Sequence, residues 1–345
     1  MIQRKYELSF ATPAFLGNAA QKAQWRTPPI KALLRQWWRV AYALDKRFAV
    51  RVDEMRHEEG ILFGNAWLEG NFSKSLVRLR LDRWSEGTLK SWQALPTINH
   101  PEVRNPVGSD LYLGYGPLKF ENRAVLLKAH AAIQSGESAI LSLAAPDESV
   151  QRIECALWMM DRYATLGGRS RNGWGSFTLK PCNGAPALNG QIPAKSWIDC
   201  LDRDWPHAMG QDEKGALVWK TQAFDDWKAA MKRLAEIKIG LRTLFKFTTG
   251  RDATGPEARH WLSYPVTNHS VKLWGRDARL PNTLRFKIRL RADGKLVGII
   301  FHMPHMPVSF LLNRHSDSDQ MIKRVWRQVH TFLDAEDQGL TRSAE

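Results

Sequence analysis

The sequence is poor in cysteine and has no long apolar segment. Its three cysteines, Cys155, Cys182 and Cys200, are odd in number and lack CxxC spacing. This pattern argues against a disulfide framework or a cysteine zinc site and fits a reducing compartment. No apolar run approaches the roughly 18–20 residues that span a bilayer, and the charged N-terminus MIQRKYELSF is not typical of a signal peptide. We therefore expect a cytoplasmic globular protein without a membrane segment.

Acidic residues are fewer than basic ones, and long stretches of the chain contain almost none of them. The chain has 50 Lys and Arg against 35 Asp and Glu, a net charge of +15. Residues 8–44 and 162–198 contain no acid, and residues 259–291 contain one acid among eight basic residues. Such a balance favours a polyanionic partner. Because basic and acidic residues occupy different stretches of the sequence, we predict one basic surface built from distant segments. The alternative is that the basic residues lie on ordinary solvated faces of a basic protein.

The first half of the chain follows a strand–helix–strands–helix–strand order. Thr27 is expected to cap a helix that has Pro28 and Pro29 in its first turn and apolar residues at i, i+3, i+4 and i+7. A second amphipathic helix is predicted over residues 148–166. Strands are predicted over residues 6–10, 76–81, 111–115, 124–129, 139–143 and 176–179. This order is that of a ferredoxin-like domain.

The second half repeats the order after a segment rich in Pro, Gly, Asn and acids. A strand is predicted over residues 216–223, a hairpin over 284–290 and 296–301, and helices over 224–245 and 321–333. We expect an α+β fold of two ferredoxin-like (RRM-like) domains with insertions. Their predicted bounds are 1–180, with a helical insertion around 45–75, and 216–345, joined by a linker or excursion over 181–215.

The first helix carries a basic stripe beside its apolar one. Lys31, Arg35 and Arg39 lie at i, i+4 and i+8. Lys31 stands in the first turn, where the helix dipole makes a cation unfavourable. An anion held there by Lys31 and the free N–H groups would remove the conflict. The alternative is a solvated helix face.

A glycine-rich segment, LGGRSRNGWG, joins the second helix to the following strand at residues 166–175. Its glycines would let backbone N–H groups approach phosphates, Arg169 and Arg171 add charge, and Trp174 offers a ring for a base. The segment matches neither GxGxxG after a strand nor GxxxxGK[ST], so it does not indicate a nucleotide cofactor. The alternative is a tight connection.

The strand over residues 284–290 alternates apolar and basic side chains. Arg285, Lys287 and Arg289 are expected on its solvent face, spaced about 6.6 Å apart, which suits the phosphates of an extended nucleic acid. A solvated strand face is the competing interpretation.

Patterns typical of catalytic or metal sites are scarce. His302 and His305 have no flanking carboxylate or cysteine, and His57 lacks a second histidine at helical spacing. Cys155 is expected to pack inside a helix. We predict no catalytic residue, no metal and no small-molecule cofactor.

Five stretches, taken in order, resemble the RAMP (repeat-associated mysterious protein) superfamily of CRISPR systems. The specific ones are RTPPIKALLRQWWR at residues 26–39 and LGGRSRNGWGS at 166–176; TPAFLG at 12–17, LFG at 62–64 and YLGYG at 112–116 also match. Within the superfamily they are most similar to the head-end subunits of type III-B Cmr effector complexes. The resemblance is good over residues 6–180 and weak beyond.

This resemblance implies a non-catalytic subunit that holds the 3′ region of a CRISPR guide RNA, helps capture target RNA in antiviral defence and contacts other RAMP subunits. It places the basic helix and the glycine-rich segment close to RNA. The candidate RNA-binding residues are Asn18, Arg26, Lys31, Arg35, Arg39, Arg169, Arg171, Asn172, Trp174, Arg285, Lys287 and Arg289.

Two other functions stay open. Other RAMP proteins are metal-independent endoribonucleases that process repeat RNA, and this activity would need a general base, for which His57, His100 and His130 are candidates. A DNA-binding accessory protein is disfavoured because no helix-turn-helix or zinc module is present.

Overall fold

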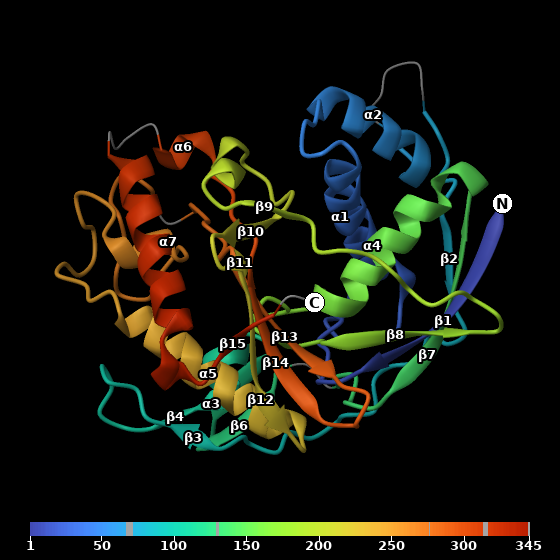
Figure 1. The fold of residues 1–345 in the computed structure, drawn as a ribbon. Coiled ribbons are helices and arrows are strands. Elements are labelled where there is room, and N and C mark those ends of the chain that lie inside the picture. Colours follow the sequence, from blue (N-terminus) through green and yellow to red (C-terminus); the bar gives the residue numbers. More distant parts are fainter. Residues whose placement is uncertain (67–71, 129–130, 276, 313–316, 344–345) are drawn as a thin grey trace.

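The computed structural model describes residues 1–66, 72–128, 131–275, 277–312 and 317–343. It is a mixed α+β structure in which the two largest sheets are antiparallel (Figure 1). The described helices include none that is both long and apolar enough to cross a membrane.

The first sheet follows the predicted β-α-β-β-α-β order. Its strands lie in the spatial order β2-β7-β1-β8. Helix α1 follows the first strand and packs against α4, which follows the third. The elements are β1 (Ile2–Phe10), α1 (Thr27–Asp45), β2 (Arg78–Leu81), β7 (Ser138–Ala145), α4 (Val150–Tyr163) and β8 (Phe177–Cys182).

The second sheet repeats this topology, because β13-β14-β12-β15 is again the order second, third, first, fourth. Its elements are β12 (Val218–Phe224), α5 (Trp227–Thr243), β13 (Leu284–Leu290), β14 (Leu296–His302), α7 (Ser318–Asp334) and β15 (Thr341–Arg342). The predicted hairpin and both predicted helices of this half are present, with ends shifted by a few residues.

The predicted helical insertion contains α2 (Val52–Phe63). After β2 the chain makes an excursion with β3 (Thr97–Ile98), β4 (Val107–Gly108), α3 (Ser109–Gly114), β5 (Leu118–Glu121) and β6 (Ala124–Leu127). The strand predicted over 111–115 is wrong, because this segment is the helix α3. Asp110, in the first turn of α3, accepts a hydrogen bond from the N–H of Leu95, and Leu113 packs inside.

The segment 181–215 takes part in a small third sheet, β11-β10-β9. Its strands are β9 (Ala194–Ser196), β10 (Met209–Asp212) and β11 (Gly215–Ala216). Short helical turns complete the described elements: η1 (Asp147–Ser149), η2 (Asp199–Asp202), η3 (Ala258–Trp261), α6 (Ser309–Leu312) and η4 (Glu336–Gln338).

The two halves share their hydrophobic cores. Every residue of β14 is buried. Val297, Ile299 and Phe301 pack with the core of the first half, whereas Leu296 and Ile300 pack with α5 and α7. In addition, α3 of the first half packs on α5 of the second half. The halves are therefore held together by apolar packing on two sides.

Edge strands β8 and β13 of the two main sheets lie side by side, and Lys287 of β13 is fully buried between them (Figure 1). Its ammonium group donates hydrogen bonds of 2.6–3.2 Å to the backbone carbonyls of Met160, Asp161, Ala164 and Phe177. The first three carbonyls lie at the C-terminal end of α4, where the helix dipole favours a cation. The prediction that Lys287 faces solvent to meet phosphates is therefore wrong.

Replacing Lys287 by methionine should lower the free energy of unfolding by about 3 kcal/mol, because buried carbonyls lose their donor. Urea unfolding measures the change. Lys295→Met is the matched control, since Lys295 lies on the same hairpin and pairs with the exposed Asp225 between β12 and α5; it should shift stability by no more than about 0.5 kcal/mol. Equal effects of the two substitutions would contradict a structural role for Lys287.

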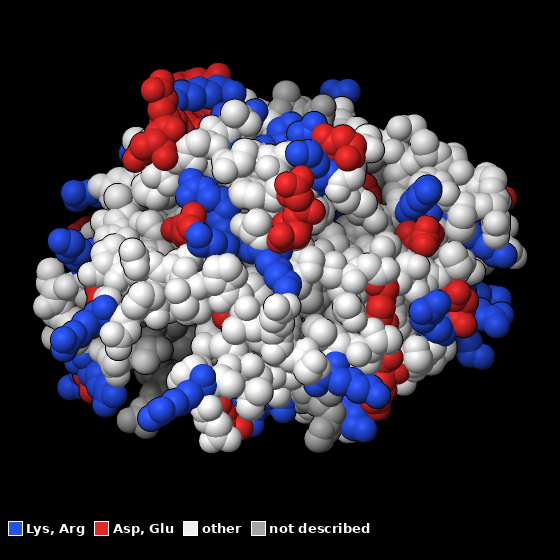
Figure 2. Space-filling model, turned by 90° about the horizontal axis from the view of Figure 1, so that it is seen from below, with Lys and Arg blue, Asp and Glu red and all other residues white. Residues whose placement is uncertain are grey.

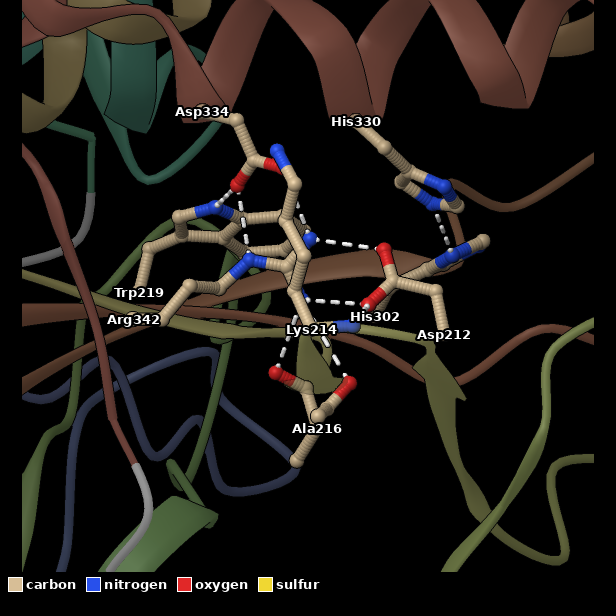
Figure 3. A network of polar contacts seen from close by, with 9 residues as sticks. Asp212, Lys214, Ala216, Trp219, His302, His330, Asp334 and Arg342 are labelled. Atoms are coloured by element: carbon tan, nitrogen blue, oxygen red, sulfur yellow. Dashed lines mark hydrogen bonds and ion pairs between the residues drawn. The ribbon is translucent and has the colours of Figure 1, made fainter.

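The C-terminal strand is fixed by Arg342, which lies between two carboxylates (Figure 3). Its guanidinium contacts Asp334 of α7 at 2.7 Å and Asp212 of β10 at 2.8 Å, and it donates to the carbonyl of Ala216 at 3.0 Å. Trp219 donates to the same Asp334 at 2.8 Å. One side chain thus joins α7, β15 and the small sheet.

Asp334 makes this junction sensitive to acid. Burial alone would raise its pKa, but hydrogen bonds from Arg342 and Trp219 outweigh burial and lower the pKa to about 2 from the usual 3.8. A lowered folded-state pKa means that the stabilisation is present above pH 4 and is lost as the pH falls toward 2.

Arg342→Ala should therefore destabilise the chain by about 2 kcal/mol at pH 7 and flatten the dependence of stability on pH between 4 and 2. Thermal unfolding across this pH range measures both effects. Arg342→Lys keeps the charge but not the two-pronged geometry, and it should fall between wild type and Arg342→Ala. An unchanged pH profile in Arg342→Ala would refute the assignment.

Candidate nucleic-acid interface

Basic side chains are not gathered into one continuous patch on the face seen in Figure 2. Lys and Arg groups are scattered there over a mostly uncharged surface, and several lie next to Asp or Glu. The predicted single basic surface is therefore absent from this face. The sites where cations converge are smaller, and they lie where the two halves meet.

The basic stripe of α1 is partly neutralised by one buried acid. Helix α1 begins at Thr27, with Arg26 rather than Thr27 in the N-cap position and no side-chain cap. Glu59 of α2, with a side chain only 2% exposed, pairs with Arg35 at 2.8 Å and with Arg39 at 2.6 Å. Both arginines therefore anchor the insertion to α1. Burial, and then the charge of Arg35, lower the pKa of Lys31.

The glycine-rich segment is built by tight backbone contacts. Gly175 has φ +66°, and a Cβ there would lie 1.9 Å from the carbonyl oxygen of Leu166. The N–H groups of Gly168, Asn172, Gly173 and Gly175 all donate to backbone carbonyls within 3.1 Å. The prediction that glycine N–H groups here approach phosphates is wrong for these three glycines, because their N–H groups already have partners.

Trp174 also departs from the prediction. Its ring is fully buried and lies 5.4 Å from Phe15 and 5.5 Å from Trp92, measured between ring centroids. A base cannot stack on an enclosed ring. Trp174 is a core residue that holds the segment against the excursion.

Residues 171–172 dock on the edge of β13. Asn172 forms an isolated parallel bridge with Phe286, whose N–H donates to the carbonyl of Arg171 at 3.0 Å. Paired residues in neighbouring strands point to the same side, so Arg171 and Arg285 lie next to each other. Burial lowers the pKa of Arg285 to about 9, and the charge of Arg171 contributes in the same direction.

These two arginines line a pocket with Arg39 of α1. Its volume is about 220 Å³, and Trp37 and Trp205 contribute aromatic walls. A neighbouring cavity of about 380 Å³ shares Arg39 and Trp205. The structure thus brings together three predicted residues, one from each of the three basic segments.

A second group of cations lies on the other side of the same segment. Lys238 of α5 donates to the side-chain oxygen of Asn172 at 2.7 Å, and Asn172 donates to the carbonyl of Leu113 at 2.7 Å. Burial lowers the pKa of Lys238 to about 7, and the charges of Arg242 and Arg169 act in the same direction. Cations therefore approach residues 169–172 from both sides.

The remaining predicted residues lie apart from the pocket lining. The side chain of Asn18 accepts hydrogen bonds from the N–H groups of Ala20 and Lys22 and shapes its own loop. Arg169 donates to the carbonyl of Tyr115 at 2.6 Å. Arg26 and Arg289 are half-buried and do not line the pocket.

No metal site accompanies these residues. Within the described ranges, no group of three or more His, Cys, Asp or Glu side chains is placed to hold an ion.

A family model described as the RAMP superfamily matches residues 7–178. This part of the chain belongs to the RAMP superfamily. The match includes α1 and the glycine-rich segment, whereas Arg285 lies beyond it. A comparison with curated proteins found no match.

Three solved structures are similar to this RAMP chain over nearly all its length. One is a crystal structure of apo Cmr1 from Pyrococcus furiosus, with 14% identity, coverage of 94% of this chain and 97% of that chain, and a TM-score of 0.44. Two are cryo-EM structures of type III-B Cmr-beta bound to cognate target RNA, one of them also with AMPPnP. They have 12% and 11% identity, cover 95% of this chain and 99% of those chains, and give TM-scores of 0.47 and 0.45. At these values the similarities assign no role to this chain.

Sequence reasoning missed two residues of the interface. Trp205 lies in the segment 181–215, which was interpreted as a linker or excursion, and Lys238 follows the inward-facing residue Ile237 of α5. The loop position of Trp205 was an available signal, because an aromatic residue among polar ones is unusual in a linker. Nothing in the local pattern marks Lys238.

If Glu59 only anchors Arg35 and Arg39, Glu59→Gln should lower the stability of this RAMP chain by about 2–3 kcal/mol, since two arginines lose a buried partner. Chemical denaturation measures this. Glu54→Gln, on the same helix but half-exposed, is the control and should have little effect. A stable Glu59→Gln variant would contradict the anchoring role.

Proposed function

We propose that this RAMP chain is a non-catalytic RNA-binding subunit of a type III-B (Cmr) CRISPR effector complex. It lies near the 3′ end of the guide RNA, contacts other RAMP subunits and helps capture target RNA in antiviral defence. The observation that carries the proposal is the pocket in which Arg39, Arg171 and Arg285 converge. Family membership and the ordered motifs of the first half support it.

The architecture fits this role as two ferredoxin-like domains with insertions, spanning residues 1–180 and 216–345. Support comes from the two four-stranded sheets, which have the same strand order. In this assignment the pocket lies between the domains, so RNA would contact both of them. Residues 181–215 connect the domains and supply Trp205 to the pocket wall.

Binding should be strongest for single-stranded RNA. Affinities for single-stranded RNA, single-stranded DNA and duplex DNA are compared at one salt concentration, and the RNA titration is repeated across salt concentrations. Each phosphate neutralised contributes a slope of about −0.7 in the log–log salt plot for a single strand. Preference for duplex DNA, or binding without salt dependence, would refute the proposal.

The assembly is tested by purification from the native host under mild salt, followed by sequencing of bound RNA and identification of bound proteins. Short RNAs with CRISPR repeat tags, together with other RAMP subunits, are the expected result. Recovery of the chain without guide RNA or partners would contradict the placement in a Cmr complex.

An endoribonuclease is the second candidate, and one observation favours it. Burial, together with the smaller effects of the charges of Arg285 and Arg171, lowers the pKa of His305 to about 4. A neutral imidazole therefore lies near the pocket, as a general base would require. Incubation of the protein with repeat RNA in the presence of EDTA distinguishes the two candidate functions. Site-specific cleavage that His305→Ala abolishes would show that the chain is an endoribonuclease and overturn the non-catalytic assignment.

A further inference from the structure

The pocket between the two halves differs from the other arginine sites in its lack of an acid. Its described lining contains three arginines and no carboxylate. Elsewhere, buried arginines are paired: Arg259 with Glu102 and Arg342 with Asp334 and Asp212. In this pocket Arg39 has such a partner in Glu59, whereas Arg171 and Arg285 have none among the described residues.

The lack of a partner for a guanidinium group is clearest at Arg285. Its Nε atom is buried and has no hydrogen-bond partner among the described residues. Among the described residues, the side chain of Arg171 beside it makes only a long contact, from Nη1 to the carbonyl of Asn282 at 3.5 Å. Two adjacent cations in a partly desolvated site repel each other, and an anion placed between them would remove both the repulsion and the unsatisfied donor.

The size of the pocket restricts the anion. About 220 Å³ is below the roughly 300–1,000 Å³ typical of sites for drug-sized ligands and cofactors. Guanidinium groups bind phosphate with two parallel hydrogen bonds, a geometry that lysine lacks. Trp205 is half-buried in the wall, and it and Arg39 also line the neighbouring cavity, to which Arg56 contributes.

We propose that Arg171 and Arg285 hold one phosphate group of single-stranded RNA in this pocket, and that Trp205 stacks on the base attached to it. This inference rests on the proposed RNA-binding function and names its subsite. Arg39, which lines both the pocket and the neighbouring cavity, guides the next phosphate, while its own bond to Glu59 keeps it in place.

The test uses fluorescent uridine oligonucleotides and the full chain. Arg285→Gln and Arg171→Gln should each weaken binding about tenfold and reduce the salt slope by about 0.7. Arg291→Gln is the matched control, because Arg291 lies just beyond β13, is half-exposed and pairs with Asp293; it should bind like wild type. Trp205→Ala should weaken binding about tenfold without changing the slope.

A second measurement does not depend on RNA. Inorganic phosphate should raise the Tm of wild type relative to chloride at equal ionic strength, and it should not do so for Arg285→Gln. Without phosphate, Arg285→Gln should have a Tm equal to or above that of wild type, since it removes an unpaired buried charge. A loss of RNA affinity accompanied by a fall in Tm would mean that the fold was damaged, and it would overturn the assignment.

The outcomes separate this inference from the function on which it rests. RNA binding that Arg285→Gln and Arg171→Gln leave unchanged overturns the subsite and keeps the function. Absence of any RNA binding overturns both. Oligonucleotides with hydroxyl or phosphate ends show which phosphate is bound. If the variants lose equal affinity for both kinds of oligonucleotide, the bound group is an internal phosphodiester. If they lose affinity only for oligonucleotides with phosphate ends, it is a terminal phosphate.

Discussion

The buried ammonium group of Lys287 fixes how the two halves of this chain meet. It reaches from an edge strand of the second sheet to four carbonyl oxygens of the first half, three of them at the end of α4. Burial lowers its pKa to about 7, while Asp161 opposes this effect. The cost of burying a cation is offset because its donors are fully used and the α4 dipole is favourable. The same docking sets residues 171–172 against β13, and this contact creates the arginine pocket.

Charges in this structure fall into two kinds. Some hold the chain together and already have partners, as Arg342 has Asp334 and Asp212, and as Arg35 and Arg39 share Glu59. Others converge without an acid, as Arg171 and Arg285 do. The second kind adds nothing to the stability of the fold, and we propose that these cations bind a polyanion. Net charge alone does not separate the two kinds, whereas partner geometry does.

The sequence allowed much of the framework to be predicted. Helices α1, α4, α5 and α7 follow from periodicity, because each buries one apolar face, and the hairpin β13–β14 follows from two apolar runs on either side of a turn. The helix α3 was mistaken for a strand, since its short apolar run fits either period. The strands of the small sheet β11-β10-β9 were missed because they are 2 to 4 residues long, too short for an alternating pattern to show.

The candidate site was predicted in part, and the failures share one cause. Alternation along residues 284–290 correctly separated two faces, but the pattern cannot show that the basic face of Lys287 packs on another sheet. Glycine spacing likewise cannot show that the N–H groups of Gly168, Gly173 and Gly175 are already bonded. Glu59 lies 20 residues after Arg39 in sequence, on an insertion whose return to α1 no local pattern reveals. Hydrophobic periodicity does not reveal contacts between segments that are distant in the sequence.

We propose that RNA contacts both halves of the chain at their junction. Ultraviolet crosslinking of bound RNA, followed by mass spectrometry of the linked peptides, is the sharpest test. Crosslinks are expected in the peptides that contain Arg171, Trp205 and Arg285. Crosslinks confined to one half, or to the β5–β6 hairpin, would contradict it.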